Sequence, residues 1–204
     1  MLKRKKTFII AEVGTNHNGS IKTAFSMIRK IAKTGVDAIK FQLANPEDVY
    51  SDDAFKADYQ KRNDASKSIV EMSKRLQLKE TEHYKLSQFC KKNKVIYLCS
   101  AFDLKSLVFL DKRLKIPIFK IPSGEIHSTD MINYIAKKNK EIFVSTGMAT
   151  IDEIGEVLKK LKGHGNKKIT ILHCISSYPA NKNFINLNVM DELKKVFKVD
   201  VGYS

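Results

Sequence analysis

Tryptophan is absent from this sequence, and proline and cysteine occur only four and three times in 204 residues. Three cysteines cannot build a disulfide scaffold, and Cys90, Cys99 and Cys174 lack the paired spacing of a metal site, so we expect them to stay reduced and buried. The low proline and glycine content excludes collagenous and low-complexity proteins. With 43% hydrophobic residues, the composition is typical of a globular protein, and we expect residues 1–204 to form one domain.

Long hydrophobic runs are also missing. No apolar run reaches the 18 residues that indicate a membrane-spanning helix, and residues 1–6 precede the first apolar run without the apolar stretch of a signal peptide. We therefore expect a cytoplasmic protein without a membrane partner.

Arginine is scarce, although the net charge is +15: five of the 37 basic residues are arginine and the rest are lysine. The lysines fall singly or in pairs along expected helix faces, which favours a solvated surface. Proteins that read nucleic acids depend on arginine forks and stacked aromatic side chains, and neither pattern is present. We expect no nucleic-acid partner, whereas a small anionic substrate is compatible with the charge.

Short apolar runs typical of buried parallel strands alternate with amphipathic helical segments along the whole chain. The seven expected strands cover residues 8–11, 38–41, 95–99, 118–121, 142–145, 169–174 and 199–203. The expected helix N-caps are Ser20, Thr81, Asp130 and Thr150, the last in a capping box with Glu153. Gly35 ends the first helix. Repeated strand–helix units of this kind predict a parallel sheet.

Polar or ionisable residues stand at the carboxyl end of nearly every expected strand. They are Glu12, Lys40, Gln42, Ser100, Lys120, Ser123, Ser145, His173, Ser176 and Ser204. In a closed barrel these positions converge on one mouth, whereas in a doubly wound sheet only those near the switch point meet. Because no glycine-rich dinucleotide motif follows the first strand either, we predict an α/β fold of the (β/α)8 TIM-barrel type. Residues 43–78 are expected to form an elaborated loop over that mouth, followed by a helix.

The convergent residues form an anion-binding set. Lys40 and Lys120 supply positive charge and the serines supply hydroxyl donors, which suits a phosphate or carboxylate ligand. Glu12 and Glu125 are candidates for proton transfer, with acid and base roles both open. We interpret His17, in a polar loop, as a functional residue, and His173, inside an apolar strand, as a core histidine.

Six stretches, taken in order, resemble the N-acetylneuraminate synthase family, which includes legionaminic and pseudaminic acid synthases. They are AEVGTNHNG at 11–19, DAIKFQ at 37–42, KADYQ at 56–60, KIPSGE at 120–125, STGM at 145–148, and HC at 173–174 with YP at 178–179. The resemblance implies a (β/α)8 barrel in which phosphoenolpyruvate condenses with an N-acetylmannosamine-type sugar to form a nine-carbon acid and phosphate.

By the same resemblance, one set of residues holds phosphoenolpyruvate: Lys40, Ser100, Lys120, Ser123, Ser145, Ser176 and Ser204. Glu12, Gln42 and Tyr178 face the sugar or a bound water, and Glu125 is the acid/base candidate. This makes Glu125, Glu12 and Lys40 the expected catalytic residues. Ser176 departs from the family pattern, because many relatives have asparagine there, and Ser100 with Ala101 stands where Thr-Pro is common.

The resemblance also implies a divalent metal, Mn2+ or Mg2+, and a homodimer built through a C-terminal antifreeze-like domain. In relatives, GYS at 202–204 continues into Asp-His, whose histidine ligates the metal. The sequence ends at Ser204, so we assign no metal ligand and expect a truncated synthase barrel, with a monomer or association through open sheet edges.

Our main hypothesis is a sialic-acid-type synthase that uses phosphoenolpyruvate, with residues 43–64 and the domain absent here selecting the amino sugar. Two alternatives stay open: a synthase that uses a phosphorylated aldose, and a non-catalytic anion-binding remnant. The five arginines all lie outside the strand ends, which disfavours a phosphorylated acceptor.

Overall fold

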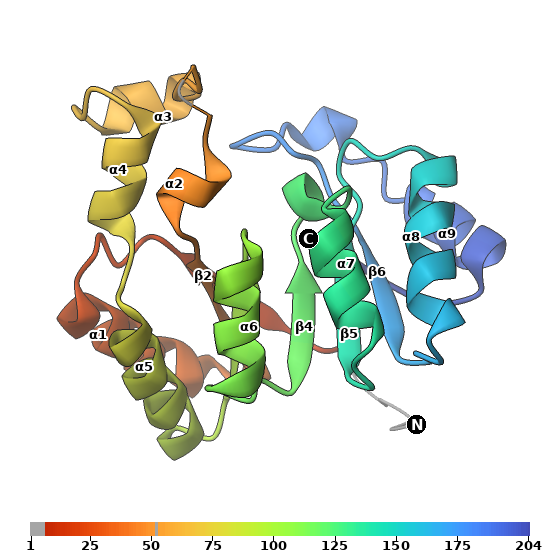
Figure 1. Ribbon diagram of the computed structural model, residues 1–204, viewed down its shortest axis with the longest axis horizontal. Helices are drawn as coiled ribbons and strands as arrows, with labels where there is room; N and C mark the ends of the chain where they lie inside the picture. Colours follow the sequence, from red (N-terminus) through yellow and green to blue (C-terminus); the bar gives the residue numbers. More distant parts are fainter. Residues whose placement is uncertain (1–6, 52) are drawn as a thin grey trace. The chain divides into compact units, whose positions relative to one another are not determined.

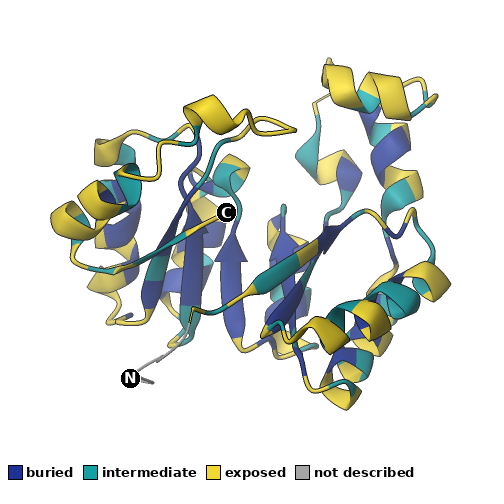
Figure 2. Ribbon diagram, turned by 180° about the vertical axis from the view of Figure 1, so that it is seen from behind, coloured by how far each residue is buried: buried dark blue, intermediate teal, exposed yellow. Residues whose placement is uncertain are grey.

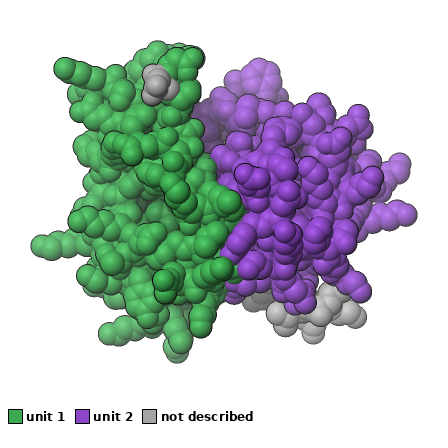
Figure 3. All heavy atoms as spheres, viewed as in Figure 1, with its two compact units in different colours: residues 1–116 green, residues 117–204 purple. Residues whose placement is uncertain are grey.

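The computed structural model describes residues 7–51 and 53–204. Residues 1–6, which we noted for their lack of an apolar stretch, lie outside the described residues. The chain divides into two compact units, residues 1–116 and 117–204, which are coloured separately in Figure 3 and are described one at a time.

The first unit contains three parallel strands. Its elements are β1 (Ile10–Gly14), α1 (Ile21–Ile31), η1 (Ala32–Thr34), β2 (Ala38–Leu43), α2 (Pro46–Val49), α3 (Asp58–Asn63), α4 (Ile69–Leu76), α5 (Glu80–Lys92), β3 (Ile96–Ala101) and α6 (Leu104–Lys112). β1 pairs with β2 and β2 with β3, and α1 packs against α5. In this register Glu12 stands beside Lys40, and Gln42 stands beside Ser100.

The second unit contains four parallel strands. Its elements are β4 (Ile118–Ile121), η2 (Ser123–Glu125), α7 (Thr129–Ala136), β5 (Glu141–Ser145), α8 (Ile151–Gly163), β6 (Ile169–His173), η3 (Lys182–Phe184), α9 (Val189–Phe197) and β7 (Asp200–Tyr203). β4 pairs with β5, β5 with β6 and β6 with β7 (Figure 1). The described residues thus contain all seven expected strands, and the predicted α/β class is confirmed.

Most of the strands are apolar because they are buried on both faces. Figure 2 shows β4, β5 and β6 in dark blue, while the helices expose their outer sides. The largest fully buried side chains are Phe41 of β2 and Phe119 of β4, each in the core of its own unit. Because the faces of these strands are occupied by the core, the strand ends are where candidate functional side chains remain accessible.

The helix ends follow the predicted capping residues in two cases. The Ser20 hydroxyl accepts a hydrogen bond from the Thr23 N–H, and Thr150 and Glu153 form the predicted capping box of α8. Gly35 has φ +83° and ends the first helical segment.

Two predicted N-caps are wrong. Asp130 lies inside the first turn of α7, which begins at Thr129 after Ser128. Thr81 lies inside the first turn of α5, where the Glu82 carboxylate accepts a hydrogen bond from the Lys79 N–H. In α7 the acidic Asp130 is favoured within the first turn by the helix dipole, so it does not mark the cap itself. In α5 the first turn already begins at Glu80, so Thr81 follows the cap by two residues.

The segment between β2 and α5 is also more structured than predicted. We expected a loop followed by a helix; α4 stands where that helix was expected, and the loop before it contains the two further helices α2 and α3. All three lie beyond the carboxyl end of β2 (Figure 1). Helices of four and six residues have too few turns to display a clear apolar period, which is why the sequence did not predict α2 and α3.

Across the part of the chain that the structure describes, no helix combines the length and the apolar character needed to cross a membrane.

Candidate functional site

The sequence-predicted site residues gather in two groups, one in each unit. The β1–β3 group consists of Glu12, Lys40, Gln42 and Ser100. The β4–β6 group consists of Lys120, Ser123, Ser145 and Ser176, together with Gly147 and Cys174. In both groups the side chains come from the carboxyl ends of neighbouring parallel strands.

Glu12 is the centre of the β1–β3 group. Its carboxylate forms an ion pair with the Lys40 ammonium and accepts a hydrogen bond of 3.2 Å from the Gln42 side-chain amide. The Lys40 side chain is only 13% exposed, whereas Glu12 is 42% exposed. Gly14 makes room for this arrangement, because a Cβ at its position would lie 3.1 Å from Glu12 Oε1. The lysine is therefore held in place by a carboxylate that still faces solvent.

Ser100 adds a hydroxyl at the end of β3. It is 1% exposed, and its Oγ has no hydrogen-bond partner among the described residues. Buried hydroxyls are nearly always hydrogen-bonded, so an unpaired one beside Gln42 in the strand register is a donor suited to a ligand atom.

Lys120 is the buried cation of the β4–β6 group. Its side chain is 7% exposed. Its ammonium donates to Ser145 Oγ at 2.7 Å and to the Ile121 carbonyl at 3.0 Å. A buried ammonium is costly unless charge or hydrogen bonds compensate for its lost hydration, and a bound anion supplies the strongest compensation.

The other members of the β4–β6 group surround Gly147. The Gly147 N–H donates to Ser123 Oγ at 3.1 Å, and Ser123 Oγ lies 3.1 Å from Cys174 Sγ. A Cβ at position 147 would lie 2.2 Å from Ser176 Oγ and 3.0 Å from both Cys174 Sγ and Ser123 Oγ. Only glycine allows these polar groups to approach the backbone so closely.

Three further predicted residues lie in the second unit outside this group. Glu125 is half-buried at the end of η2. Tyr178 is 68% exposed on the segment after β6. Ser204 follows β7, and its N–H donates to the His173 carbonyl at 2.8 Å.

His17 and His173 each have a ring nitrogen within hydrogen-bond distance of a backbone group. His17 is buried and its Nδ1 accepts a hydrogen bond of 3.1 Å from the Gly19 N–H, so it fixes the turn between β1 and α1. Our functional interpretation of His17 stays a prediction. His173 Nε2 lies 2.7 Å from the Ile185 carbonyl, which confirms it as a core histidine with a satisfied ring.

No metal-binding group is present among residues 7–51 and 53–204: no three His, Cys, Asp or Glu side chains are close enough together to hold an ion. The described residues therefore do not fit the divalent metal that the family resemblance implies, and we derive no chemical step through it.

Three features were missed at the sequence level. Cys174 is only partly buried and contacts Ser123, whereas we expected it to be buried without a role. His83 lies at 2.6 Å from the Tyr97 hydroxyl, and burial lowers the pKa of His83 to about 4. Lys56 has a buried ammonium. Of these three, only Lys56 was marked in the sequence, because it lies in the KADYQ stretch. The contacts of His83 and Cys174 join residues 14 or more positions apart, so no local pattern indicates them.

The fold and these two groups define a class: an α/β protein of the TIM-barrel type that gathers cations and hydroxyls at the carboxyl ends of its strands. The chain belongs to the NeuB family, whose model matches residues 27–204. This confirms the resemblance seen in the sequence.

Similar proteins agree with this assignment. The chain is 44% identical to an N,N'-diacetyllegionaminic acid synthase of Campylobacter jejuni over 98% of its own length and 60% of that relative. It is 31% identical to a pseudaminic acid synthase of the same organism, covering 98% of this chain and 58% of that one. It therefore spans somewhat more than half the length of the curated relatives it matches.

A solved structure supports the fold. The N-acetylneuraminic acid synthetase of Leptospira borgpetersenii, crystallised with citrate, matches with a TM-score of 0.83 and 29% identity over 96% of this chain and 64% of that chain. A 3-deoxy-D-arabino-heptulosonate 7-phosphate synthase of Thermotoga maritima, at 15% identity and a TM-score of 0.60 over 92% of this chain and 60% of that chain, shares the fold alone.

Proposed function

We propose that this chain takes part in the condensation of phosphoenolpyruvate with an N-acetylmannosamine-type amino sugar, which forms a nine-carbon nonulosonic acid and releases phosphate. Membership of the NeuB family supports a condensing synthase, and the names of the similar proteins support this class of product.

The observation that carries the proposal is the buried Lys120 ammonium. It donates a hydrogen bond to Ser145 and belongs to the β4–β6 group, which also contains Gly147. Phosphoenolpyruvate carries a phosphate and a carboxylate, and charge-assisted hydrogen bonds in a site shielded from water bind such groups strongly. We assign Lys120, Ser123, Ser145 and Ser176 to this substrate. Ser204, at the end of β7, is assigned to it by family resemblance.

The β1–β3 group supplies the second set of contacts in this proposal. Lys40 and Ser100 donate to phosphoenolpyruvate, because Lys40 is a nearly buried cation and Ser100 has an unpaired hydroxyl. Glu12 and Gln42 face the sugar or a bound water through the exposed side of the Glu12 carboxylate. Tyr178, exposed after β6, is assigned to the sugar by family resemblance.

The proposed chemistry is balanced as follows. The C2=C3 electron pair of phosphoenolpyruvate forms a bond from C3 to the aldehyde carbon of the open-chain sugar, and the aldehyde oxygen takes up a proton. Water adds to C2 and loses a proton. The C2–O bond to phosphate then breaks with its electron pair on the phosphate oxygen, and loss of the remaining hydroxyl proton leaves the ketone. Glu125 is the group proposed to transfer the proton at the aldehyde oxygen or the water.

The positions of the arginines favour an unphosphorylated acceptor. Within the described part of the chain, Arg29, Arg62, Arg75 and Arg113 lie on helices or at a helix end, and none lies on a strand. A phosphorylated sugar would call for a bidentate arginine fork near the strand ends.

We test the proposal with Lys40→Met and Lys120→Met, which remove one charge and keep an unbranched side chain. Each substitution should weaken phosphoenolpyruvate binding in calorimetry at least about tenfold, since a hydrogen bond to a charged group contributes roughly 1.5–3 kcal/mol. Phosphate release from phosphoenolpyruvate, assayed with candidate amino sugars with and without Mn2+, should fall at least as much.

The controls are Lys30→Met and Lys159→Met, which remove exposed lysines from α1 and α8. They should leave binding unchanged. If wild-type protein releases no phosphate with any nonulosonate precursor, the condensation is refuted; binding of phosphoenolpyruvate without turnover would then support the anion-binding alternative.

A further inference from the structure

Lys56, in the segment between β2 and α4, has a buried ammonium outside both site groups. The residue is 8% exposed. Its Nζ donates to the Asp64 carbonyl at 2.8 Å and to the Ser66 carbonyl, and lies 3.3 Å from Asp64 Oδ1. Three acceptors from residues 64 and 66 replace the water lost on burial, so the ammonium joins the two ends of a loop.

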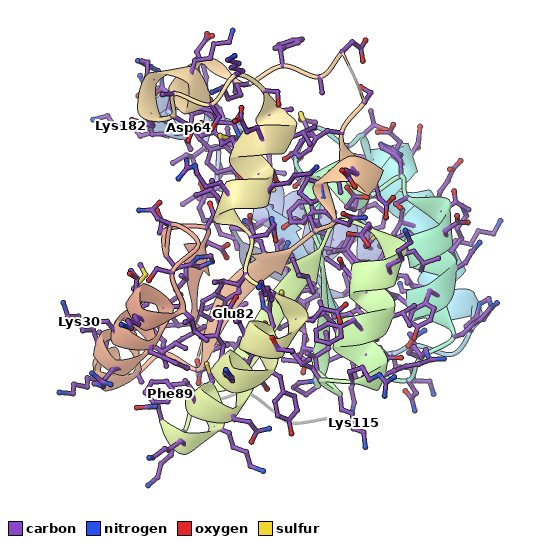
Figure 4. All side chains as sticks on the ribbon, turned by 60° about the vertical axis from the view of Figure 1, so that its left-hand side comes forward. Lys30, Asp64, Glu82, Phe89, Lys115 and Lys182 are labelled. Carbon is purple, nitrogen blue, oxygen red and sulfur yellow. The ribbon has the colours of Figure 1, made fainter. Side chains whose placement is uncertain are left out.

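Asp64 is the second member of this cluster. Its carboxylate accepts a hydrogen bond from the Ser66 N–H at 2.9 Å and forms an ion pair with Arg75 of α4. The Ser66, Lys56 and Arg75 contacts hold the pKa of Asp64 well below its usual value. We call Lys56, Asp64 and Arg75 the α3 clamp. Figure 4 shows Asp64 close to the upper end of α4.

The clamp encloses α3 (Asp58–Asn63). None of the six residues of α3 is buried. A helix of six residues is unstable by itself in water, because nucleation costs more than its few hydrogen bonds return. Because no residue of α3 is buried, the polar contacts of the clamp stabilise the loop around it.

The clamp is attached to the strand edge that carries the β1–β3 group. A Cβ on Gly19, in the turn after β1, would lie 2.4 Å from the Arg75 carbonyl, so α4 touches that turn. At the other end, the Asn45 N–H donates to Asp103 Oδ2 at 2.7 Å and the Ala44 N–H donates to Gln77 Oε1 at 3.2 Å. The segment therefore leaves β2 directly after the end that carries Gln42 and is fixed there on both sides.

We propose that Lys56 is a positioning residue: with Asp64 it holds α3 in one conformation within the segment that follows the carboxyl end of β2, so that α3 forms part of the surface that selects the acceptor sugar. This inference rests on the proposed condensation. A preformed α3 would lose less conformational entropy when the sugar binds than a flexible loop would. This gives a physical reason why residues 43–64 could select the sugar.

The test compares Lys56→Met with Lys61→Met, a matched loss of one lysine from the same loop. Lys61 is exposed and lies outside the clamp. Hydrogen exchange of a peptide spanning residues 55–67 should speed up about tenfold or more in Lys56→Met and stay within about twofold of wild type in Lys61→Met. Asp64→Asn, which keeps the side-chain shape, should reproduce the effect of Lys56→Met.

The kinetic measurement separates positioning from a general loss of structure. In Lys56→Met the KM of the acceptor sugar should rise about fivefold, while the KM of phosphoenolpyruvate stays within about twofold. Equal exchange in the two lysine variants, or an equal rise of both KM values, would overturn the inference. If wild-type protein gives no turnover, the proposed condensation fails on that result, and the exchange comparison alone decides whether Lys56 positions α3.

Discussion

At the scale of single residues, the tightest constraint is at Gly147. The polar atoms of Ser123, Cys174 and Ser176 all lie within 3.0 Å of the place that its Cβ would occupy. Serine and cysteine side chains from the connections after β4 and β6 meet the backbone at this point, and the Gly147 N–H is one of the donors. A methyl group would therefore displace several members of the β4–β6 group at once.

We predict that Gly147→Ala abolishes most phosphoenolpyruvate binding while the protein stays folded. Ser176 Oγ, at 2.2 Å from the added Cβ, must move, and its exposed position lets it do so without opening the core. Affinity measured by calorimetry should drop by about tenfold or more, because the donors no longer point at one ligand position.

Gly163→Ala is the matched control, because nothing lies within 4 Å of a Cβ at the end of α8. It should bind phosphoenolpyruvate as wild type does and be slightly more stable. Equal affinity in Gly147→Ala and wild type would show that the close packing around Gly147 has no part in binding.

Some contacts between single residues could be predicted from the sequence, and others could not. Lys120 and Ser145 could be predicted to meet, because each stands at the carboxyl end of its own buried strand and parallel register brings such ends together. The contact of Cys174 with Ser123 could not be predicted, since it depends on the path of the chain after β6. The Lys56–Asp64 contact could not be predicted for a similar reason. In the sequence both residues look like solvated surface charges, and only the fold of the loop brings them together.

At the scale of elements, α8 shows a complete capping box. The Thr150 hydroxyl accepts a hydrogen bond of 3.3 Å from the Glu153 N–H, and the Glu153 carboxylate accepts one of 2.6 Å from the Thr150 N–H. The capping box could be predicted from the sequence because its two residues lie within one helical turn. The same rule failed for α5, where Lys79 is the cap and Thr81 only follows it.

We predict that Thr150→Ala lowers the free energy of unfolding by about 1 kcal/mol, the usual cost of losing an N-cap hydroxyl. Urea unfolding followed by far-UV circular dichroism measures this change. Thr81→Ala is the control: Thr81 lies inside the first turn of α5, so its substitution should change stability by less than about 0.5 kcal/mol. A larger loss from Thr81→Ala than from Thr150→Ala would contradict the capping assignment.

The predicted elements were most accurate where burial dominates. Residues 118–121 form a strand with the predicted bounds because every one of them is buried. The segment that holds α2, α3 and α4 was predicted as an elaborated loop followed by a helix. The helix α4 buries Ile69 and Met72, whereas α3 buries none of its residues and is held by the ion pairs of the α3 clamp. Ion pairs leave no periodic pattern in a sequence, and for this reason tertiary contacts were needed to find them.

At the scale of the whole molecule, charge and buried histidines act on stability together. The net charge of +15 comes mostly from lysines, and acid adds further positive charge to it. His83 is fully buried in the first unit, 2.6 Å from the Tyr97 hydroxyl, and its Nε2 has no partner among the described residues. Burial disfavours a positive charge on its ring, and the neighbouring His17 opposes it further.

We predict that stability falls as the pH drops from about 6.5 to about 4. Burial lowers the pKa of His83 from 6.5 to about 4, so in this range the unfolded chain takes up a proton that the folded chain does not. The free energy of unfolding therefore decreases with falling pH and levels off below about 4, by at most about 3 kcal/mol from this group. Burial also lowers the pKa of His17, which acts in the same direction.

Urea midpoints measured at steps between pH 7.5 and 4 for wild type and His83→Gln isolate the contribution of His83, because all carboxylates titrate alike in both proteins. The variant, whose amide can still bond to Tyr97, should show the shallower dependence, and parallel curves for the two proteins would mean that His83 is not the group that titrates.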